Sequence, residues 1–322
     1  MASLTRRTLL AGSASAAAAT TFPLHSAAAA APPAGKQAPG FYRFKIGSYE
    51  LTAVYDGLWY RDIDDKFVRN VPFPEVQQAL TDARMPANKI VLPFTALLVN
   101  TGAKLILIDT GTGGQIAPTA GSMDLGAAGI DPNAVDAILI SHFHPDHING
   151  IKTKENQVVF PNAEINVPAP EWAYWMDDAN MNAAPEAARP AFRNVRRVFG
   201  DIAKEVKRFE PGKEVAPGIT SIAAYGHTPG HTVFAVASGN ASLLVLGDTT
   251  NHPALFARHP EWQAVFDVDG SMAAETRKKL LDRSAADRML VQGYHFPFPA
   301  SGHIAKEGSG YAFVPVHWQP TL

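Results

Sequence analysis

The part of the sequence that decides the fold is the run His142-Phe143-His144-Pro145-Asp146-His147. It follows the apolar segment Ala137–Ser141, which is typical of a buried strand, so the run should begin at the carboxyl edge of a sheet. His142 and His144 are two residues apart and should point the same way in extended backbone. Four potential ligands on one turn cannot all reach a single tetrahedral ion, but they can serve two adjacent ions. The alternative is a solvated polar loop that holds three histidines by coincidence.

Three later segments carry further potential ligands. The segment Gly226-His227-Thr228-Pro229-Gly230-His231-Thr232 places histidine in a Gly/Pro turn before a strand. The apolar segment Leu243–Leu246 runs into Gly247 and Asp248, which would aim a carboxylate into the same cleft. His295 follows soon after the strand-like segment Met289–Val291. The order of these motifs resembles that of the metallo-β-lactamase superfamily, which implies an α/β fold, the four-layer αββα sandwich.

The resemblance implies a centre of two metal ions, with three ligands for each ion and one shared carboxylate. The expected ligands are His142, His144 and His231 for the first ion, Asp146, His147 and His295 for the second, and Asp248 for both. Divalent ions such as zinc accept imidazole and carboxylate, and an anionic bridge offsets the repulsion between two cations. We expect two zinc-like ions, a bridging hydroxide as the nucleophile, and Asp146 and Asp248 as the catalytic carboxylates.

Other polar residues are expected around the ligands. Asp109 ends the apolar segment Leu105–Ile108 and matches a superfamily position that orients a ligand imidazole; a turn or helix cap is the alternative. His227 is interpreted as a supporting residue and not as a ligand. A role for His303 at the site is left open.

A closer resemblance, to methyl parathion hydrolase and its lactonase-like relatives, covers nearly the whole chain from Gly40 onward. It is carried by segments such as Gly40-Phe41-Tyr42-Arg43, Phe160-Pro161-Asn162-Ala163 and Gly302-His303-Ile304. It implies hydrolysis of lactones, aryl esters or, weakly, phosphotriesters. Two other functions stay open: a thioester hydrolase similar to glyoxalase II, and a non-catalytic periplasmic metal-binding protein. Zinc β-lactamases lack the bridging aspartate, so Asp248 argues against an antibiotic as substrate.

The same resemblance implies an aromatic substrate pocket. Trp172, Trp175 and Phe192 fall in the corresponding region, and helical spacing puts the two tryptophans on one face. Core packing is the alternative for each of them. The segments Arg84–Leu92 and Thr249–Asp269 are expected to shape the rest of the pocket.

Composition limits the partners of the protein. The 322 residues include no cysteine, which excludes disulfides and thiolate ligands, so any metal must be held by histidine and carboxylates. The net charge is −2 and basic residues do not cluster, which argues against nucleic acid. No segment of the mature chain is apolar enough to span a membrane. A small-molecule substrate and a homodimer are the expected partners.

The beginning of the chain is expected to be an export leader. Residues 1–34 contain the paired arginines Arg6 and Arg7, an Ala-rich apolar stretch and a run of small residues, in the order of a twin-arginine signal. This predicts a periplasmic or secreted protein; a disordered leader without targeting is the alternative. Residues 35–322 should then form a single domain.

Alternating and periodic apolar patterns predict the elements of that domain. Strands are expected at Tyr49–Asp56, Phe94–Val99, Lys104–Asp109, Ala137–Ser141, Ile219–Ala224, Val233–Ala237, Leu243–Leu246 and Met289–Val291. Helices are expected at Glu75–Ala83, Pro170–Asp178, Ala187–Phe199 and Ser271–Ala286. The stretch Asp177–Pro190 is interpreted as a long surface loop.

Overall fold

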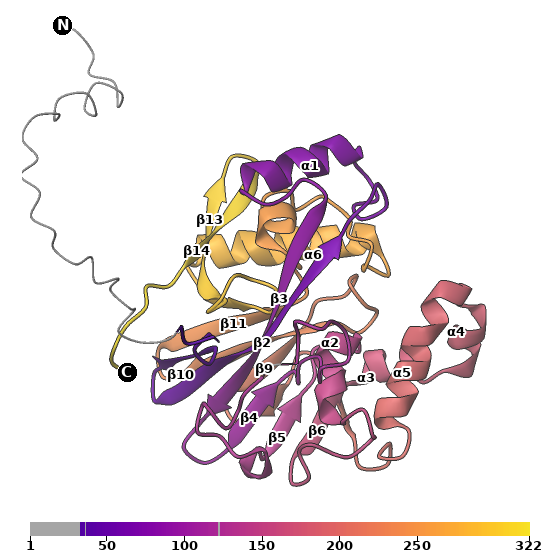
Figure 1. The fold of residues 1–322 in the computed structure, drawn as a ribbon. Coiled ribbons are helices and arrows are strands. Elements are labelled where there is room, and N and C mark those ends of the chain that lie inside the picture. The colour runs from indigo at the N-terminus through magenta and orange to yellow at the C-terminus, as the bar shows by residue number, and fades with distance from the viewer. Residues whose placement is uncertain (1–32, 36, 122) are drawn as a thin grey trace, which may run out of the picture. The chain divides into compact units, whose positions relative to one another are not determined.

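Two seven-stranded sheets form the centre of the structure, a computed structural model that describes residues 33–35, 37–121 and 123–322 (Figure 1). The first sheet contains, in this order, β1 (Phe41–Ile46), β2 (Tyr49–Asp62), β3 (Lys89–Asn100), β4 (Leu105–Ile108), β5 (Ala137–Leu139), β6 (Glu164–Pro168) and β7 (Lys207–Phe209). The second contains β14 (Gly310–Pro315), β13 (Ser301–Glu307), β12 (Leu290–Gly293), β11 (Ala241–Gly247), β10 (Thr232–Ser238), β9 (Ile219–Ala223) and β8 (Glu214–Ala216). The predicted export leader falls almost entirely on residues 1–32, outside the described residues.

Alternation of side chains along the strands builds the layers. In β3, Leu97 and Val99 face a core shared with the second sheet, whereas Ala96 and Leu98 face the opposite way. In β11 of the second sheet, Val245 belongs to the shared core and its neighbours to an outer one. Each sheet therefore has one face against the other sheet and one face toward helices.

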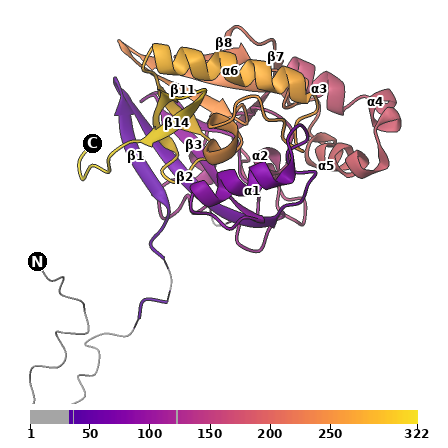
Figure 2. The ribbon, with the colours of Figure 1, turned by 90° about the horizontal axis from the view of Figure 1, so that it is seen from above.

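Helices cover the two outer faces. Helices α3 (Ala169–Trp175) and α5 (Arg189–Phe199) pack on the first sheet, and α6 (Gly270–Ala286) packs on the second (Figure 2). The resulting order of layers is helix, sheet, sheet, helix, so the expected four-layer sandwich is confirmed. The remaining helices are α1 (Phe73–Asp82), α2 (Pro145–Ile148), α4 (Asp178–Ala183) and the short turns η1 (Pro132–Ala134), η2 (Asn149–Ile151), η3 (Glu186–Ala188) and η4 (Pro253–Ala257). No described helix is long and apolar enough to cross a membrane.

Strand β2 is longer than the sequence pattern predicts. We expected it to end at Asp56, and the Asp56-Gly57 sequence that follows is of a kind common in turns. The structure instead has a bulge, with a shift in register between Tyr55 and Gly57. Gly57 has φ 101°, and a Cβ there would lie 2.2 Å from the carbonyl oxygen of Thr119. The strand continues to Asp62, and this extension later forms one wall of a pocket.

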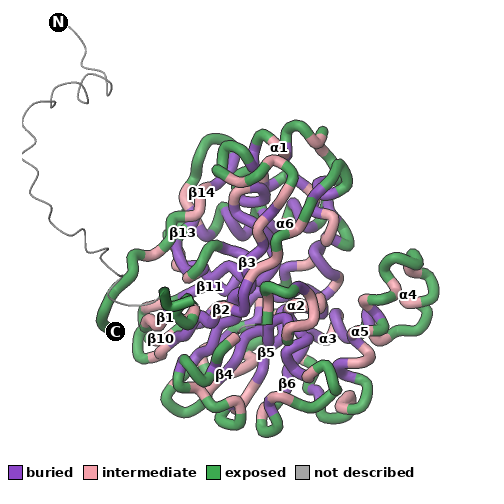
Figure 3. Tube along the Cα trace, in the orientation of Figure 1, coloured by how far each residue is buried: buried purple, intermediate pink, exposed green. Residues whose placement is uncertain are grey.

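The stretch predicted as a long loop, Asp177–Pro190, is largely helical. Asp177 caps α4 by accepting hydrogen bonds from the main-chain N–H groups of Ala179 and Asn180, and η3 follows. No residue of α4 is buried, and Figure 3 shows the helix as an exposed projection beside α5. The helix was missed because its stability comes from capping and not from an apolar stripe.

Candidate metal centre

The first motif lies where strand β5 gives way to helix α2. His142 and His144 stand in the connecting segment, and Pro145 starts the helix, so that Asp146 and His147 are in its first turn. Proline suits this position because its missing N–H has no partner in a first turn. The local sequence therefore turns the chain sharply and spreads four side chains toward one side of the sheet edge.

One group of potential metal ligands combines this motif with the second half of the chain. It consists of His142, His144, His227 and Asp248. The Nε2 atom of His227 lies 3.2 Å from His142 Nε2, 2.9 Å from His144 Nδ1 and 3.3 Å from Asp248 Oδ2. Four atoms that can donate electron pairs to a metal thus meet at one point.

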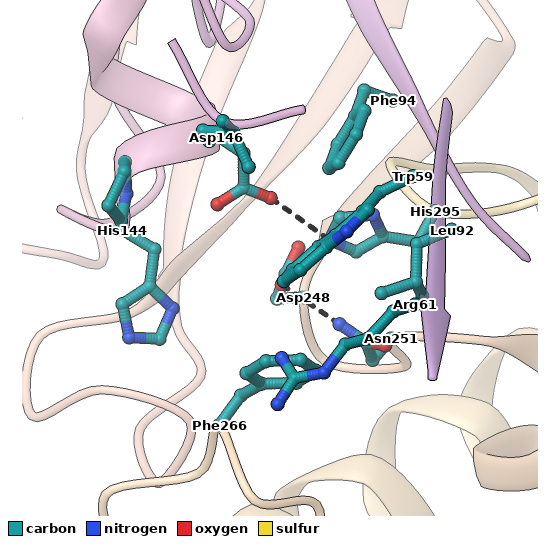
Figure 4. A pocket seen from close by; sticks show the side chains of 12 residues that line it. Trp59, Arg61, Leu92, Phe94, His144, Asp146, Asp248, Asn251, Phe266 and His295 are labelled. Atoms are coloured by element: carbon teal, nitrogen blue, oxygen red, sulfur yellow. Dashed lines mark hydrogen bonds and ion pairs between the residues drawn. The ribbon is translucent and has the colours of Figure 1, made fainter. Parts of the chain in front are cut away.

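A second group adjoins the first. It consists of Asp146, His147, His295 and again Asp248. His147 Nε2 lies 3.1 Å from Asp248 Oδ1, and His295 Nε2 lies 3.0 Å from Asp248 Oδ2 and 3.4 Å from Asp146 Oδ2. Figure 4 shows both carboxylates beside His295 at the base of a pocket. Asp248 is shared by the groups, at the position expected for a bridging carboxylate.

Hydrogen bonds outside the cluster fix the protons of four imidazoles. The pairs are His142 Nδ1 with Ser141 Oγ (3.1 Å), His147 Nδ1 with Asp109 Oδ2 (2.7 Å), His227 Nδ1 with Asp267 Oδ1 (2.9 Å) and His295 Nδ1 with the Pro93 carbonyl (2.9 Å). Ser141 Oγ donates its own proton to Asp109, so it must accept from His142. In neutral rings, each Nε2 atom therefore presents a lone pair to the cluster.

Two buried polar atoms without hydrogen-bond partners in the described part of the chain show whether a metal ion would fit between the ligands. His147 Nε2 and Asp248 Oδ1 are buried and have no hydrogen-bond partner among the described residues. Lone pairs on facing nitrogens repel each other unless a cation lies between them, and buried polar atoms rarely stay unsatisfied. The donor set of imidazole and carboxylate, without thiolate, suits divalent ions of the zinc kind. The residues therefore fit two such ions.

The pKa of a histidine is shifted in opposite directions in the two groups. Burial, followed by the neighbouring imidazoles, lowers the pKa of His142 well below its usual value, so its ring is neutral and able to bind a metal. Burial also acts to lower the pKa of His147, but Asp248, Asp146 and Asp109 outweigh it and hold the pKa well above the usual value. The same carboxylates that favour a proton on His147 favour a cation beside it.

The structure reverses the predicted roles of two histidines. His231, predicted as a ligand, lies outside both groups: its Nδ1 atom donates to the Ala224 carbonyl at 3.0 Å. Its Nε2 atom accepts from the main-chain N–H of Asp248, also at 3.0 Å. Both ring nitrogens are thereby occupied. His227, predicted as a supporting residue, instead occupies the first group.

Two further polar residues can now be placed. Asp109 binds His147 as expected for an orienting carboxylate, and it also accepts from the main chain and the hydroxyl of Ser141. His303 is exposed on β13 and contacts the Met289 carbonyl through Nδ1. It does not belong to either ligand group.

The prediction of an aromatic pocket at Trp172, Trp175 and Phe192 is wrong. All three side chains are buried in the core between the first sheet and its helices. Trp175 packs against Phe192, and its Nε1–H donates to Glu171 Oε1 at 2.6 Å. Helical spacing put the tryptophans on a common face, but that face meets the sheet and not a cavity.

The pocket beside the ligands has a different wall. Its volume is about 290 Å³, and it is lined by His144, Asp146, Asp248 and His295 together with apolar side chains. The wall includes Trp59 and Arg61 from β2, Leu92 and Phe94 from β3, and Asn251 and Phe266 from the segment before α6 (Figure 4). Leu92 lies in Arg84–Leu92, and Asn251 and Phe266 lie in Thr249–Asp269, the segments expected to shape the pocket. Trp59 and Arg61 were missed because β2 was expected to end before them.

Buried Glu171 joins the two ligand-bearing turns. Its Oε1 atom accepts from the main-chain N–H of Phe143, between His142 and His144, at 2.9 Å. Its Oε2 atom accepts from Thr228 Oγ1 at 2.8 Å and from the main-chain N–H of Gly230 at 2.7 Å. The approach to Gly230 is so close that a Cβ there would lie 2.1 Å from the nitrogen of Glu171. The carboxylate therefore holds the turn of His227 against the first motif.

Replacing Glu171 by glutamine should loosen this connection. The glutamine amide keeps one acceptor oxygen, but its NH2 group would face N–H or O–H donors that now bond to the Glu171 carboxylate. At least one buried donor then loses its partner, which lowers the free energy of unfolding by about 1–3 kcal/mol. Metal affinity should fall roughly 10- to 100-fold, the usual effect of removing a partner that orients ligands. Denaturant unfolding of metal-free protein and a metal titration measure the two effects.

The matched control is Glu164→Gln, the same chemical change at a half-exposed carboxylate that pairs with Lys207. It should change stability by less than about 1 kcal/mol. Equal stability and metal affinity for the Glu171 and Glu164 variants would show that Glu171 does not position the turns.

Comparison with known proteins agrees with this centre. Residues 91–295 match the metallo-β-lactamase superfamily, and the chain belongs to that superfamily. A probable metallo-hydrolase of Mycobacterium tuberculosis is 24% identical over 225 residues, which cover 62% of this chain and 71% of that protein. The chain is thus a metal-dependent hydrolase of this fold, and the family recognised in the sequence is confirmed.

Two solved structures are similar over most of the chain. AidC, a dizinc quorum-quenching lactonase in complex with a product, N-hexanoyl-L-homoserine, has a TM-score of 0.82 and 29% identity, covering 87% of this chain and 99% of that chain. The hydrolase AbOPH of the β-lactamase superfamily has a TM-score of 0.82 and 28% identity, covering 88% of this chain and 100% of that chain.

Proposed function

We propose that the protein hydrolyses small-molecule lactones and aryl esters, and phosphotriesters weakly, with two zinc ions held by the two ligand groups. The observation that carries the proposal is the position of the pocket: aromatic and apolar side chains lead directly to Asp146, Asp248, His144 and His295. A substrate bound by the wall would have its ester group next to the ligands. The similarity to a dizinc lactonase supports the same proposal, a lactone hydrolase with two zinc ions.

The protein's own residues account for binding and positioning. Trp59, Phe94 and Phe266 offer flat apolar surface to an aryl or alkyl group and exclude water from one side of it. Asp248 contacts both histidine groups and would hold the two ions at a fixed separation. Divalent ions, when bound, lower the pKa of coordinated water and stabilise negative charge on oxygen.

The leaving group helps to define the substrate class. The hydroxyl of Tyr294 is near the ligands, but it already donates to the main-chain carbonyl of Asp146 at 2.5 Å. Because its proton is engaged in that bond, and because burial raises the pKa of Tyr294, this phenol is not placed to protonate a leaving group. A phenolate or lactone alkoxide leaving as an anion suits such a site better than an amine, which must be protonated.

A substrate panel with metal removal tests the proposal. Purified protein should hydrolyse dihydrocoumarin and aryl esters readily, a methyl parathion-like triester slowly, and β-lactams not at all. Incubation with a chelator should abolish these activities, and zinc should restore them while magnesium, which prefers oxygen ligands, should not. Activity that survives complete metal removal, or β-lactams as the best substrates, would contradict the proposal.

A further inference from the structure

Arg61 lies on the pocket-facing side of the extension of β2. Trp59 and Arg61 are two residues apart in this strand and share a face, and Trp59 pairs with Leu92 of β3 across the sheet. The neighbouring residue Tyr60 points to the other side and is exposed. Arg61 therefore brings a positive charge into a wall that is otherwise mostly apolar (Figure 4).

Aromatic rings hold the guanidinium group of Arg61 in place. Its Cζ atom lies 4.9 Å from the ring centre of Trp59, 4.6 Å from that of Phe266 and 5.7 Å from that of Phe67. Cation–π contacts of this kind use the face of the guanidinium and leave the N–H groups at its edge available. The arginine is thus restrained in direction before any ligand binds.

The N–H groups of Arg61 have no partner among the described residues. The side chain forms no hydrogen bond and no ion pair there, although it is half-buried. Burial lowers the pKa of Arg61 and the charge of Asp64 opposes this, but arginine stays protonated in proteins. A fixed, partly desolvated cation without a partner favours an anion, since charge-assisted pairs with carboxylates are short, strong and often bidentate.

We propose that Arg61 binds a carboxylate on the part of the substrate that lies away from the reacting bond. The enzyme would then prefer esters and lactones that carry a second, acidic group. This rests on the proposed function, because it concerns the substrate of the same centre. Asp146 and Asp248 also face the pocket, but in the proposed centre the charge of two divalent ions offsets them, and they do not repel the anion.

Two matched substrates test this preference. One is the 4-nitrophenyl monoester of adipic acid, which carries a free carboxylate, and the other is the same compound with that carboxylate blocked as a methyl ester. The wild type should show a KM roughly 10-fold lower for the acid, since blocking the carboxylate removes its charge-assisted hydrogen bonds to Arg61. The two kcat values should agree within about twofold, because the reacting bond is identical.

Arg61→Gln should raise KM for the acid about 10-fold more than it raises KM for the blocked ester, and kcat should change to the same extent for both substrates. For Arg61→Lys, KM for the acid should lie between the values of the wild type and Arg61→Gln, because lysine keeps the charge but lacks the paired N–H donors of the guanidinium. The control is Arg208→Gln, at an arginine that stacks on Trp172 at 4.4 Å but does not line the pocket. It should behave as the wild type with both substrates.

Three results would overturn the inference. If Arg61→Gln impairs both substrates equally, the arginine only supports the wall. If the wild type does not discriminate between the substrates and Arg61→Gln changes neither, the pocket has no carboxylate site although the hydrolase function stands. If the wild type hydrolyses neither aryl ester, the proposed function fails and the inference fails with it.

Discussion

Asp248→Asn should remove nearly all activity while the fold is retained. The carboxylate contacts His147, His227 and His295 at 3.0–3.3 Å and is the one residue present in both ligand groups. A neutral amide cannot offset the charge of two cations, so bound metal should fall from two equivalents to one or fewer. The loss of activity should exceed the roughly 10- to 100-fold effect that follows removal of an orienting partner alone. Elemental analysis and steady-state kinetics on lactone and aryl ester substrates measure both.

Asp287→Asn provides a control with the same chemical change. Asp287 is exposed, and its one ion pair among the described residues is with Arg283, four residues earlier in the chain. This variant should keep both metal equivalents and full activity, because exposed pairs contribute little. An Asp248→Asn protein with two equivalents of metal and activity near that of the parent would remove Asp248 from the centre.

The second large effect separates the two histidines of the Gly/Pro turn. His227→Ala should lose the metal of the first group, because His227 is the only member contributed by that turn. We expect about one equivalent of metal to remain and activity to fall by more than roughly 100-fold. Metal-free stability should also fall, by about 1–3 kcal/mol, because the buried hydrogen bond to Asp267 is lost.

His231→Ala should differ from His227→Ala in its metal content. It removes buried hydrogen bonds to the Ala224 carbonyl and from the Asp248 main chain, which should destabilise the metal-free protein by about 1–3 kcal/mol. Two equivalents of metal should still bind, with reduced affinity. If His231→Ala loses a metal and His227→Ala retains both, the geometry described for this turn is wrong.

The sequence was informative where the structure depends on local chemistry. The apolar strand Ala137–Leu139 and the proline that starts α2 together fix where His142–His147 can point, and both signals are contiguous in the chain. The continuous apolar runs within β3 and β11 likewise predict buried strands. Most of the fold and six of the seven predicted ligands lie in segments whose structure follows from contiguous sequence signals. These six ligands come together in the structure.

The errors occur where distant segments decide the outcome. His227 and His231 stand four residues apart in one turn, and spacing alone does not show which ring reaches the cleft. His231 continues the pairing of β9 with β10, because its carbonyl accepts a hydrogen bond from the N–H of Ala224. In this position its ring faces the main chain of Asp248, which follows β11. On the pocket wall, Trp59 and Arg61 were missed because the bulge at Gly57, which packs against the distant residue Thr119, carries β2 beyond its expected end.

The separation between the pocket wall and the ligands affects how the protein can evolve. Beyond the bulge at Gly57, the described part of strands β2 and β3 forms one hydrogen bond to the ligands, in which the Pro93 carbonyl accepts from His295, and the ring of Phe94 packs against that of His295. Exchanging the side chains of Trp59, Arg61 or Leu92 removes none of the hydrogen bonds that hold the ligand imidazoles. Duplicated genes could therefore diverge in substrate range by single substitutions on these two strands while the inherited chemistry is preserved. Phe266 has less freedom, because the next residue, Asp267, holds His227.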